Sequence, residues 1–290
     1  MQISLHAASI LHTNVVTDVR IARDVGYDGI EMWIPKLTRY LDAGFTVDQL
    51  AATLGPLQVT MLDVLLPLES TEPETRCRLV AECELMTAVA SQLGCAALQA
   101  VALDGFPADD WPAQRDILVE SLTELSDIAS ARGVRLAVEP VSFSRFHSIP
   151  QALEVIDAVG SDRVGLVLDT WHLWTAGARL EEIAELDPQL IVCAQISDTN
   201  PKRGATWSDD DRTVLPGDGI VPLDELIDAI SRSGYAGVWS LEILSRRHWE
   251  WEPQLVAIEL LRRARVLLNA TAVTPERIDY RRSEGVQLGD

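Results

Sequence analysis

Short apolar runs alternate with longer amphipathic segments along most of the chain. The runs are rich in β-branched residues or leucine and are bounded by glycine or polar residues, which is typical of buried β-strands. We predict eight strands, at residues 3–9, 29–34, 57–66, 96–102, 135–141, 164–169, 191–197 and 238–244.

The segments between these strands carry apolar residues at helical spacing. In residues 73–93 the apolar positions recur every three or four residues, at Leu79, Cys83, Met86, Val89 and Leu93, and residues 113–132 repeat the pattern. Glycine follows several of these segments just before the next strand, because it adopts the left-handed conformation of a helix C-terminus without steric cost. These helix-ending glycines are Gly26, Gly94, Gly133, Gly160 and Gly234.

Strands that alternate with helices form parallel βαβ units with right-handed crossovers. Eight such units predict a single (β/α)8 TIM barrel, with its active site at the C-terminal face of the strands. The competing fold, an open doubly wound sheet, usually has a glycine-rich phosphate loop after its first strand, and residues 4–14 contain no glycine. We therefore expect a barrel domain at residues 1–270. The polar tail at residues 271–290 is expected either to be disordered or to cover a neighbouring subunit of a homo-oligomer.

Charge and cysteine content narrow the partners and the compartment. The chain has 24 Lys and Arg against 44 Asp and Glu, a formal net charge of −20 at pH 7. So acidic a surface repels phosphate backbones and anionic lipid, which argues against nucleic acid or a membrane as partner. The four cysteines show no CxxC spacing and no disulfide framework, as is typical of a reducing compartment. The sequence also shows no signal-peptide pattern and no apolar run of about 20 residues, so we expect a cytoplasmic protein.

The last four predicted strands each end with a polar side chain after an apolar run. These residues are Glu139 in RLAVEPV, Asp169 in GLVLDTWH, Gln195 in CAQISD and Glu242 in WSLEIL. A buried charge without a partner loses much of its solvation, and no Lys or Arg stands directly beside these residues. We therefore predict that the four residues bind a divalent metal ion. Because all four offer oxygen, Mn²⁺ or Mg²⁺ fits best, with Co²⁺ as a further candidate.

Several short motifs occur in the order and at the spacing of a known family. They are GYDGIEMW at the second predicted strand, VEP at the fifth, DTWH after the sixth, RTVLPGDG in the loop after the seventh and SLEI at the eighth. With these motifs, residues 3–268 resemble the xylose-isomerase-like barrel superfamily of sugar phosphate isomerases and epimerases. The resemblance implies that Glu139, Asp169, Gln195 and Glu242 occupy the four metal-ligand positions. Many relatives have histidine at the third position, whereas Gln195 is similar to the 3-dehydroshikimate dehydratase branch.

Glu139 and Glu242 also suit proton transfer. A metal that chelates a carbonyl and an adjacent hydroxyl acidifies the C–H between them, and two carboxylates can then remove a proton and return it. His172 lies three residues after Asp169. It is either a core histidine with satisfied hydrogen bonds or a group that bonds a substrate oxygen or delivers a proton. The resemblance favours the catalytic role.

Four further residues are candidates for substrate binding. Arg212 lies in residues 199–219, a loop long enough to cover an active site; it either binds a substrate oxygen, carboxylate or phosphate or stays exposed among aspartates. The resemblance makes Glu31 a substrate-binding or supporting acid, with a buried ion pair to Arg145 or another base as the alternative. Arg145 itself is a candidate for specificity, and Trp171 for an aromatic wall against a sugar or cyclic keto-polyol.

We expect an isomerase or epimerase that acts on a keto-sugar, a sugar phosphate or an inosose by removing a proton next to a metal-bound carbonyl. The alternative is a lyase on the same scaffold, which dehydrates 3-dehydroshikimate or a keto-inositol after the same first step. A DNA-repair endonuclease shares the fold but uses a histidine-rich metal cluster, and this chain has 5 His. A barrel that binds without catalysis is disfavoured by Glu139, Glu242 and His172. Without a lysine-rich phosphate cradle, the favoured substrate is unphosphorylated.

Overall fold

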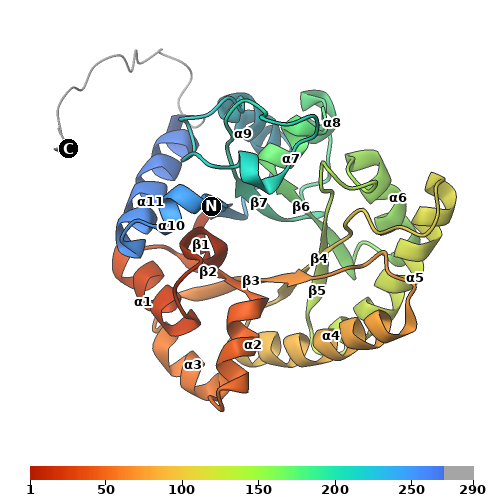
Figure 1. Ribbon diagram of the computed structural model, residues 1–290, viewed down its shortest axis with the longest axis horizontal. Helices are drawn as coiled ribbons and strands as arrows, with labels where there is room; N and C mark the ends of the chain where they lie inside the picture. The colour runs from red at the N-terminus through yellow and green to blue at the C-terminus, as the bar shows by residue number, and fades with distance from the viewer. Residues whose placement is uncertain (271–290) are drawn as a thin grey trace.

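The computed structural model describes residues 1–270, in which eight parallel strands close into one barrel in the order β1 to β8. The strands lie at the centre and the helices surround them (Figure 1). The strands are β1 (Gln2–His6), β2 (Gly29–Trp33), β3 (Gln58–Leu65), β4 (Ala97–Val101), β5 (Arg135–Glu139), β6 (Val164–Asp169), β7 (Ile191–Ile196) and β8 (Val238–Leu241). Pairing of β1 with β8 leaves the sheet without a free edge. The predicted (β/α)8 barrel is confirmed, and the predicted tail at residues 271–290 lies outside the described residues.

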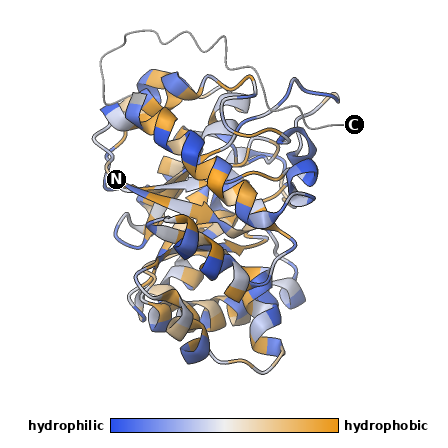
Figure 2. Cartoon of the chain, turned by 90° about the vertical axis from the view of Figure 1, so that its left-hand side faces the viewer, coloured by the Kyte–Doolittle hydropathy of each residue, from blue (hydrophilic) through white to orange (hydrophobic). Residues whose placement is uncertain are grey.

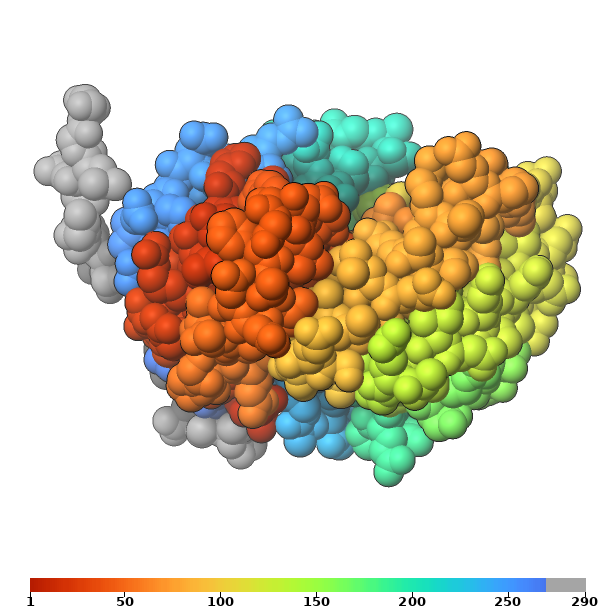
Figure 3. All heavy atoms as spheres, turned by 90° about the horizontal axis from the view of Figure 1, so that it is seen from below, coloured from red at the N-terminus to blue at the C-terminus, as the bar shows by residue number. Residues whose placement is uncertain are grey.

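The helices form an outer layer around the barrel. The first three are α1 (Val15–Val25), α2 (Ile34–Asp42) and α3 (Val47–Leu54), and the two longest are α4 (Pro73–Leu93) and α5 (Trp111–Ser130). The others are α6 (Ile149–Val159), α7 (Thr170–Thr175), α8 (Leu180–Ala184), α9 (Leu223–Arg232), α10 (Arg246–Trp249) and α11 (Pro253–Ala270). Figure 3 shows α4 and α5 side by side on one flank. Among residues 1–270, none of these helices is both long and apolar enough to span a lipid bilayer.

The predicted helix pattern is confirmed where it was most regular. The helix predicted at residues 73–93 coincides with α4, and the one predicted at 113–132 is α5, shifted by two residues. Gly94 ends α4 with a φ of 70°, in the left-handed region, and the other four helix-ending glycines also have positive φ. The outer helices carry hydrophobic and hydrophilic residues on different sides, as amphipathic helices do (Figure 2).

The strand predictions found all eight strands but placed several C-terminal ends too late. The first strand ends at His6 rather than at residue 9, because residues 7–10 form a short 3-10 helix, η1 (Ala7–Ile10). The fifth ends at Glu139 and the eighth at Leu241. The chain therefore leaves the sheet at or next to the polar residues that were predicted to form the site.

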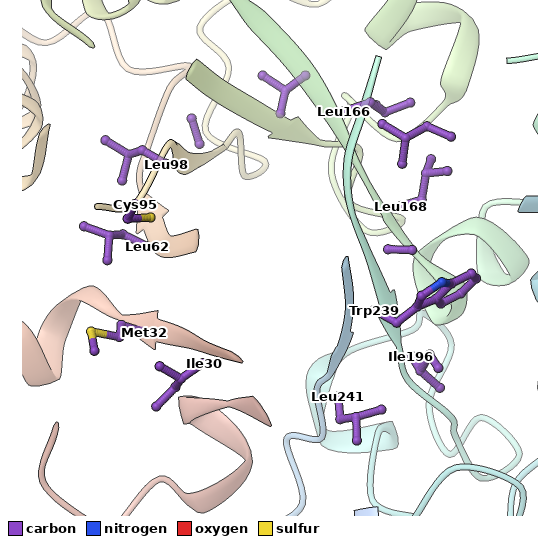
Figure 4. Close-up of a cluster of buried hydrophobic side chains, with 14 of the residues drawn as sticks. Ile30, Met32, Leu62, Cys95, Leu98, Leu166, Leu168, Ile196, Trp239 and Leu241 are labelled. Carbon is purple, nitrogen blue, oxygen red and sulfur yellow. The ribbon is translucent and has the colours of Figure 1, made fainter. Parts of the chain in front are cut away.

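Strand residues alternate between two apolar layers. Outward side chains such as Leu98, Leu166 and Trp239 belong to the larger core cluster that packs against the helices (Figure 4). A second, smaller cluster consists of Met61, Ala97, Ala137, Val167 and Cys193. Because successive strand residues point to opposite faces, this cluster lies inside the barrel.

The inner cluster determines where the polar residues at the strand ends point. Two positions after each of its members, on the same strand, stands a polar residue: Asp63, Gln99, Glu139, Asp169 or Gln195. Residues two apart on a strand share a face, so all five point into the barrel above the apolar layer. All five are buried. The barrel interior therefore contains a group of polar side chains next to the inner apolar cluster.

Candidate active site

Three carboxylates meet at the C-terminal end of the barrel. Glu139 ends β5, Asp169 ends β6 and Glu242 directly follows β8. Each offers an oxygen, and these oxygens lie within 4.8 Å of one another. The three residues are at most 9% exposed. The structure thus brings together three of the four predicted metal ligands, in a site that is nearly closed to solvent.

Arg212 neutralises part of this charge from above. Its guanidinium Nη2 lies 3.0 Å from Asp169 Oδ2 and 2.6 Å from Glu242 Oε2. It is 2% exposed, so the alternative of an exposed arginine is wrong. The guanidinium also lies 5.0 Å from the centre of the Trp171 ring, a cation–π contact, and this ring is fully buried. This arginine comes from the loop after β7 and not from a strand.

The carboxylates differ in their protonation. Burial raises the pKa of Glu139 well above its ordinary value, and the nearby charges of Glu242 and Asp169 raise it further. For Asp169, burial acts upward, but Arg212 and hydrogen bonds outweigh it and hold the pKa below the ordinary value. This direction follows from the geometry, because Asp169 Oδ1 accepts from the backbone N–H groups of Trp171 and His172 while Oδ2 accepts from Arg212. Asp169 is therefore ionised at neutral pH, and Glu139 holds a proton most readily.

His172 lies in α7 and points its ring at Glu139. Its Nε2 lies 3.9 Å from Glu139 Oε1, and its Nδ1 accepts a hydrogen bond of 3.2 Å from the backbone N–H of Ser142. Burial lowers the pKa of His172 to about 3, so the ring is neutral at neutral pH. Since Nδ1 accepts, the hydrogen of the neutral ring stays on Nε2, which faces the carboxylate. His172 can thus donate a hydrogen bond to a group beside Glu139, as the catalytic role requires.

Gln195 is held by a chain of hydrogen bonds across the barrel. Its Nε2 donates to Glu31 Oε1 at 2.9 Å and to Gln99 Oε1 at 3.4 Å, and Gln99 Nε2 in turn donates to Glu139 Oε2 at 2.9 Å. Gln195 Oε1 and Glu139 Oε1 are buried without a hydrogen-bond partner. Burial raises the pKa of Glu31 to about 7. Glu31 therefore contacts the site through Gln195. The base that it pairs with is His6, whose Nε2 lies 3.5 Å from Glu31 Oε1, and not Arg145.

His6 and Asp63 also belong to the site, although the sequence interpretation gave them no role. His6 Nε2 lies 3.2 Å from Asp63 Oδ2, 3.5 Å from Glu31 Oε1 and 3.9 Å from Glu242 Oε1. With its carboxylate neighbours Glu31 and Asp63, it forms a second group of side chains of metal-binding types. However, His6 Nδ1 accepts from the backbone N–H of Ala8 at 3.1 Å, so Nε2 carries the hydrogen and faces the carboxylates as a donor. Both stand on strands at the end where polar residues were expected to form the site, but the sequence pattern does not show what they contact.

The comparison with known families agrees with this architecture. Residues 19–265 match the family model of the xylose isomerase-like TIM barrel. The chain belongs to this family.

Individual members of the xylose isomerase-like family carry different activities in their names. The inosose isomerase of Halalkalibacterium halodurans is 28% identical over 267 residues, which cover 89% of this chain and 92% of that protein. The 3-dehydroshikimate dehydratase of Pseudomonas aeruginosa is 27% identical over 229 residues, which cover 76% of this chain and 34% of that protein. The solved structure of the IOLI protein with a bound zinc atom superposes with a TM-score of 0.87 at 26% identity, covering 93% of this chain and 99% of that one.

The residues of this xylose isomerase-like barrel fit a hard divalent ion. Glu139, Asp169 and Glu242 are carboxylates with oxygens close together, and such ligands suit hard cations. The two buried oxygens without a hydrogen-bond partner, on Glu139 and Gln195, are the atoms that an ion would satisfy. Glu242 and Asp169 would have to share their oxygens with Arg212 or release it.

Arg145 lies apart from this centre. It stands on the loop after β5, with its side chain 40% exposed, and pairs with Asp104 at 3.4 Å and Asp109 at 3.1 Å. These partners belong to the loop after β4. Its predicted role in specificity therefore requires a substrate group that reaches the rim of the barrel.

The loop that carries Arg212 is tied down by Asp198. This carboxylate accepts hydrogen bonds of 2.8–3.1 Å from the backbone N–H groups of Thr199, Gly217, Gly219 and Val221. A Cβ on Gly219 would lie 2.1 Å from Asp198 Oδ1, so only glycine allows this close approach. The PGDG part of the RTVLPGDG motif thus folds around Asp198 and holds the segment that directs Arg212 inward.

Proposed function

We propose that this chain is a divalent-metal-dependent isomerase of an inosose or a related unphosphorylated keto-polyol. It is an enzyme, as the isomerases and the dehydratase among its relatives are by name. The observation that carries the proposal is the convergence of Glu139, Asp169 and Glu242 within 4.8 Å. The similarity to inosose isomerases over nearly the whole chain supports the choice of substrate.

The reaction moves one proton between neighbouring carbons and one between their oxygens. A base removes the proton from the carbon that carries a hydroxyl next to the ketone while the carbonyl oxygen gains a proton from an acid, which gives an enediol. The original hydroxyl then loses its proton while the former carbonyl carbon gains one, so that the ketone has moved by one carbon. Glu139 and Glu242 are the acid–base pair, and the Nε2–H of His172 donates to an oxygen of the enediol. An ion held by Glu139, Asp169, Gln195 and Glu242 would polarise the carbonyl and acidify the adjacent C–H.

The test follows proton exchange directly. The protein loaded with Mn²⁺ is incubated with an inosose in D₂O, and proton NMR follows both loss of the α-proton signal and appearance of an isomer. Glu139→Gln and Glu242→Gln should each lower turnover by about 10²- to 10⁴-fold. Glu84→Gln, at an exposed position of α4, is the matched control and should leave turnover unchanged. Unchanged turnover in either site variant would contradict the mechanism.

A second candidate is dehydration of 3-dehydroshikimate. It is favoured by Gln195, the amide in the predicted ligand set, and by the similarity to the Pseudomonas aeruginosa dehydratase. Both reactions begin with proton loss next to a carbonyl, and the lyase then expels a hydroxyl from the β-carbon. Incubation with 3-dehydroshikimate and Mn²⁺ is followed by the ultraviolet absorbance of a catechol acid. Rapid product formation, together with no exchange in an inosose, would replace the isomerase by the lyase.

A further inference from the structure

The hydrogen bonds of Gln195 run in one direction. Glu31 Oε1 and Gln99 Oε1 both receive hydrogen bonds from Gln195 Nε2. Gln99 can offer its oxygen to Gln195 because its own Nε2 is turned towards Glu139 Oε2. The partners span β2, β4, β5 and β7, so the chain of bonds crosses the polar centre of the barrel.

This arrangement determines the orientation of the Gln195 amide. The Oε1 of an amide accepts hydrogen bonds and cannot donate them, and the Nε2 of Gln99 is engaged with Glu139. If the amide of Gln195 were turned over, its oxygen would face Gln99 Oε1, and the hydrogen bonds that Glu31 and Gln99 now accept would both be lost. The observed orientation is therefore the one that the neighbours accept. It leaves Gln195 Oε1 buried and without a hydrogen-bond partner, although a buried polar oxygen normally has one.

We propose that Glu31 and Gln99 are positioning residues that orient the Gln195 amide so that its Oε1, and not its Nε2, is presented to the divalent ion. The inference rests on the proposed metal-dependent function. A side-chain amide carries an oxygen that can bind a cation and an N–H₂ group that repels one. A glutamine therefore needs neighbours that fix its amide orientation in order to act as a metal ligand. Gln99 has a second task, because the same amide also holds Glu139 through Oε2 and leaves Glu139 Oε1 free.

The experiment measures metal binding rather than turnover. The dissociation constant for Mn²⁺ is determined by calorimetry on metal-free full-length protein, and water-proton relaxation reports the water bound to the ion. Glu31→Gln introduces an amide that can donate to Gln195 Oε1, so both orientations of Gln195 then have partners. Loss of a residue that orients a ligand typically weakens metal binding about 10- to 100-fold. We expect that loss, with higher relaxivity because water replaces Gln195 Oε1.

A double-mutant cycle shows whether Glu31 acts through Gln195. Gln195→Ala should weaken Mn²⁺ binding by itself, and adding Glu31→Gln to it should cause no further loss. Gln99→Met is the second variant. It removes both hydrogen bonds of the Gln99 side-chain amide and keeps a side chain of similar size. Unfolding curves of the metal-free proteins show that each variant folds.

Asp63→Asn is the matched control. It removes a carboxylate from the same buried group without touching the amide of Gln195. Its effect on Mn²⁺ binding should add to that of Gln195→Ala instead of vanishing.

Two outcomes would overturn this inference and leave the proposed function standing. In the first, Glu31→Gln binds Mn²⁺ as tightly as the wild type does. In the second, Glu31→Gln weakens Mn²⁺ binding as much in the Gln195→Ala background as in the wild type, which is the additive behaviour expected of Asp63→Asn. If the wild-type protein itself binds no Mn²⁺, the proposed metal-dependent function fails first, and the inference fails with it. The two failures are therefore distinguishable.

Discussion

Replacement of Arg212 by methionine tests the electrostatics of the site in the metal-free protein. Methionine keeps an unbranched buried side chain but removes the guanidinium that lies 3.0 Å from Asp169 and 2.6 Å from Glu242. At an effective dielectric constant of about 20, these two distances correspond to a gross attraction of ~12 kcal/mol. Most of it compensates the cost of burying the three groups. Breaking a buried ion pair by removing one partner costs about 3–5 kcal/mol, and we expect the upper end because two carboxylates lose their partner.

The loss in Arg212→Met should depend on pH. The folded pKa of Asp169 lies below its ordinary value, and Arg212 is a cause of that shift. An aspartate with a lowered folded pKa stabilises the folded state fully above its unfolded pKa of about 3.9. This stabilisation is lost as the pH falls through the folded pKa. The difference in unfolding free energy between wild type and Arg212→Met should therefore be largest near neutral pH and shrink in acid.

Urea unfolding of metal-free protein, followed by circular dichroism, measures this difference at neutral and acid pH. The matched control is Arg247→Met, which removes an arginine at an exposed position of α10 and should change stability by less than about 0.5 kcal/mol. If Arg212→Met unfolds at the same urea concentration as wild type near pH 7, the buried ion pairs do not stabilise the fold, and the electrostatic account of the site is wrong.

Three further predictions concern other parts of the site. His172, whose pKa burial lowers to about 3 from an ordinary 6.5, takes up its proton only on unfolding, so wild-type stability should fall as the pH drops between these values, by up to about 1.4 kcal/mol per pH unit. His172→Gln should flatten that slope in urea unfolding. Asp198→Ala leaves four backbone N–H groups without their acceptor, so residues 217–221 should exchange amide hydrogens faster by mass spectrometry; slow exchange there would contradict the role of Asp198 in the loop. Binding of Mn²⁺ should release protons, because burial raises the pKa of Glu139 and a ligand must be ionised to bind. Affinity should therefore rise with pH, as calorimetry in buffers of different ionisation enthalpy can show.

The barrel and the strand-end carboxylates were predictable from the sequence because both depend on local patterns. Helical spacing and glycine determine where α4 ends, and an apolar run followed by one polar residue marks Glu139 and Asp169 at the ends of β5 and β6. The strand ends at the first and last strands were placed too late, because an apolar run does not show where the backbone leaves the sheet. The 3-10 turn after β1 is as apolar as the strand before it.

The partners of these residues were not predictable, because they come from distant parts of the chain. Glu31 and Gln195 are 164 positions apart, and Arg212 meets Asp169 over 43. A sequence pattern identifies the strand that carries a residue, but not which residue lies opposite once the barrel closes. A buried pair of Glu31 with Arg145 or another base was the alternative that charge suggested, and the base that Glu31 meets is His6. In the fold, Arg145 lies on the rim and pairs with loop aspartates.

The source of the positive charge shows why the loop after β7 matters for the chemistry. The inner apolar cluster below the site excludes water from that side, so burial raises the pKa of Glu139 and Glu242 and would favour their protonated, unreactive forms as bases. Arg135, at the start of β5, does not counter this effect, because its guanidinium donates to the backbone carbonyls of Gln189 and Ser161. Arg212 instead enters on a loop anchored by Asp198. The charge state of the carboxylates therefore depends on the position of that loop, and a substrate or metal ion that draws Arg212 away also changes the acidity of the groups it contacts.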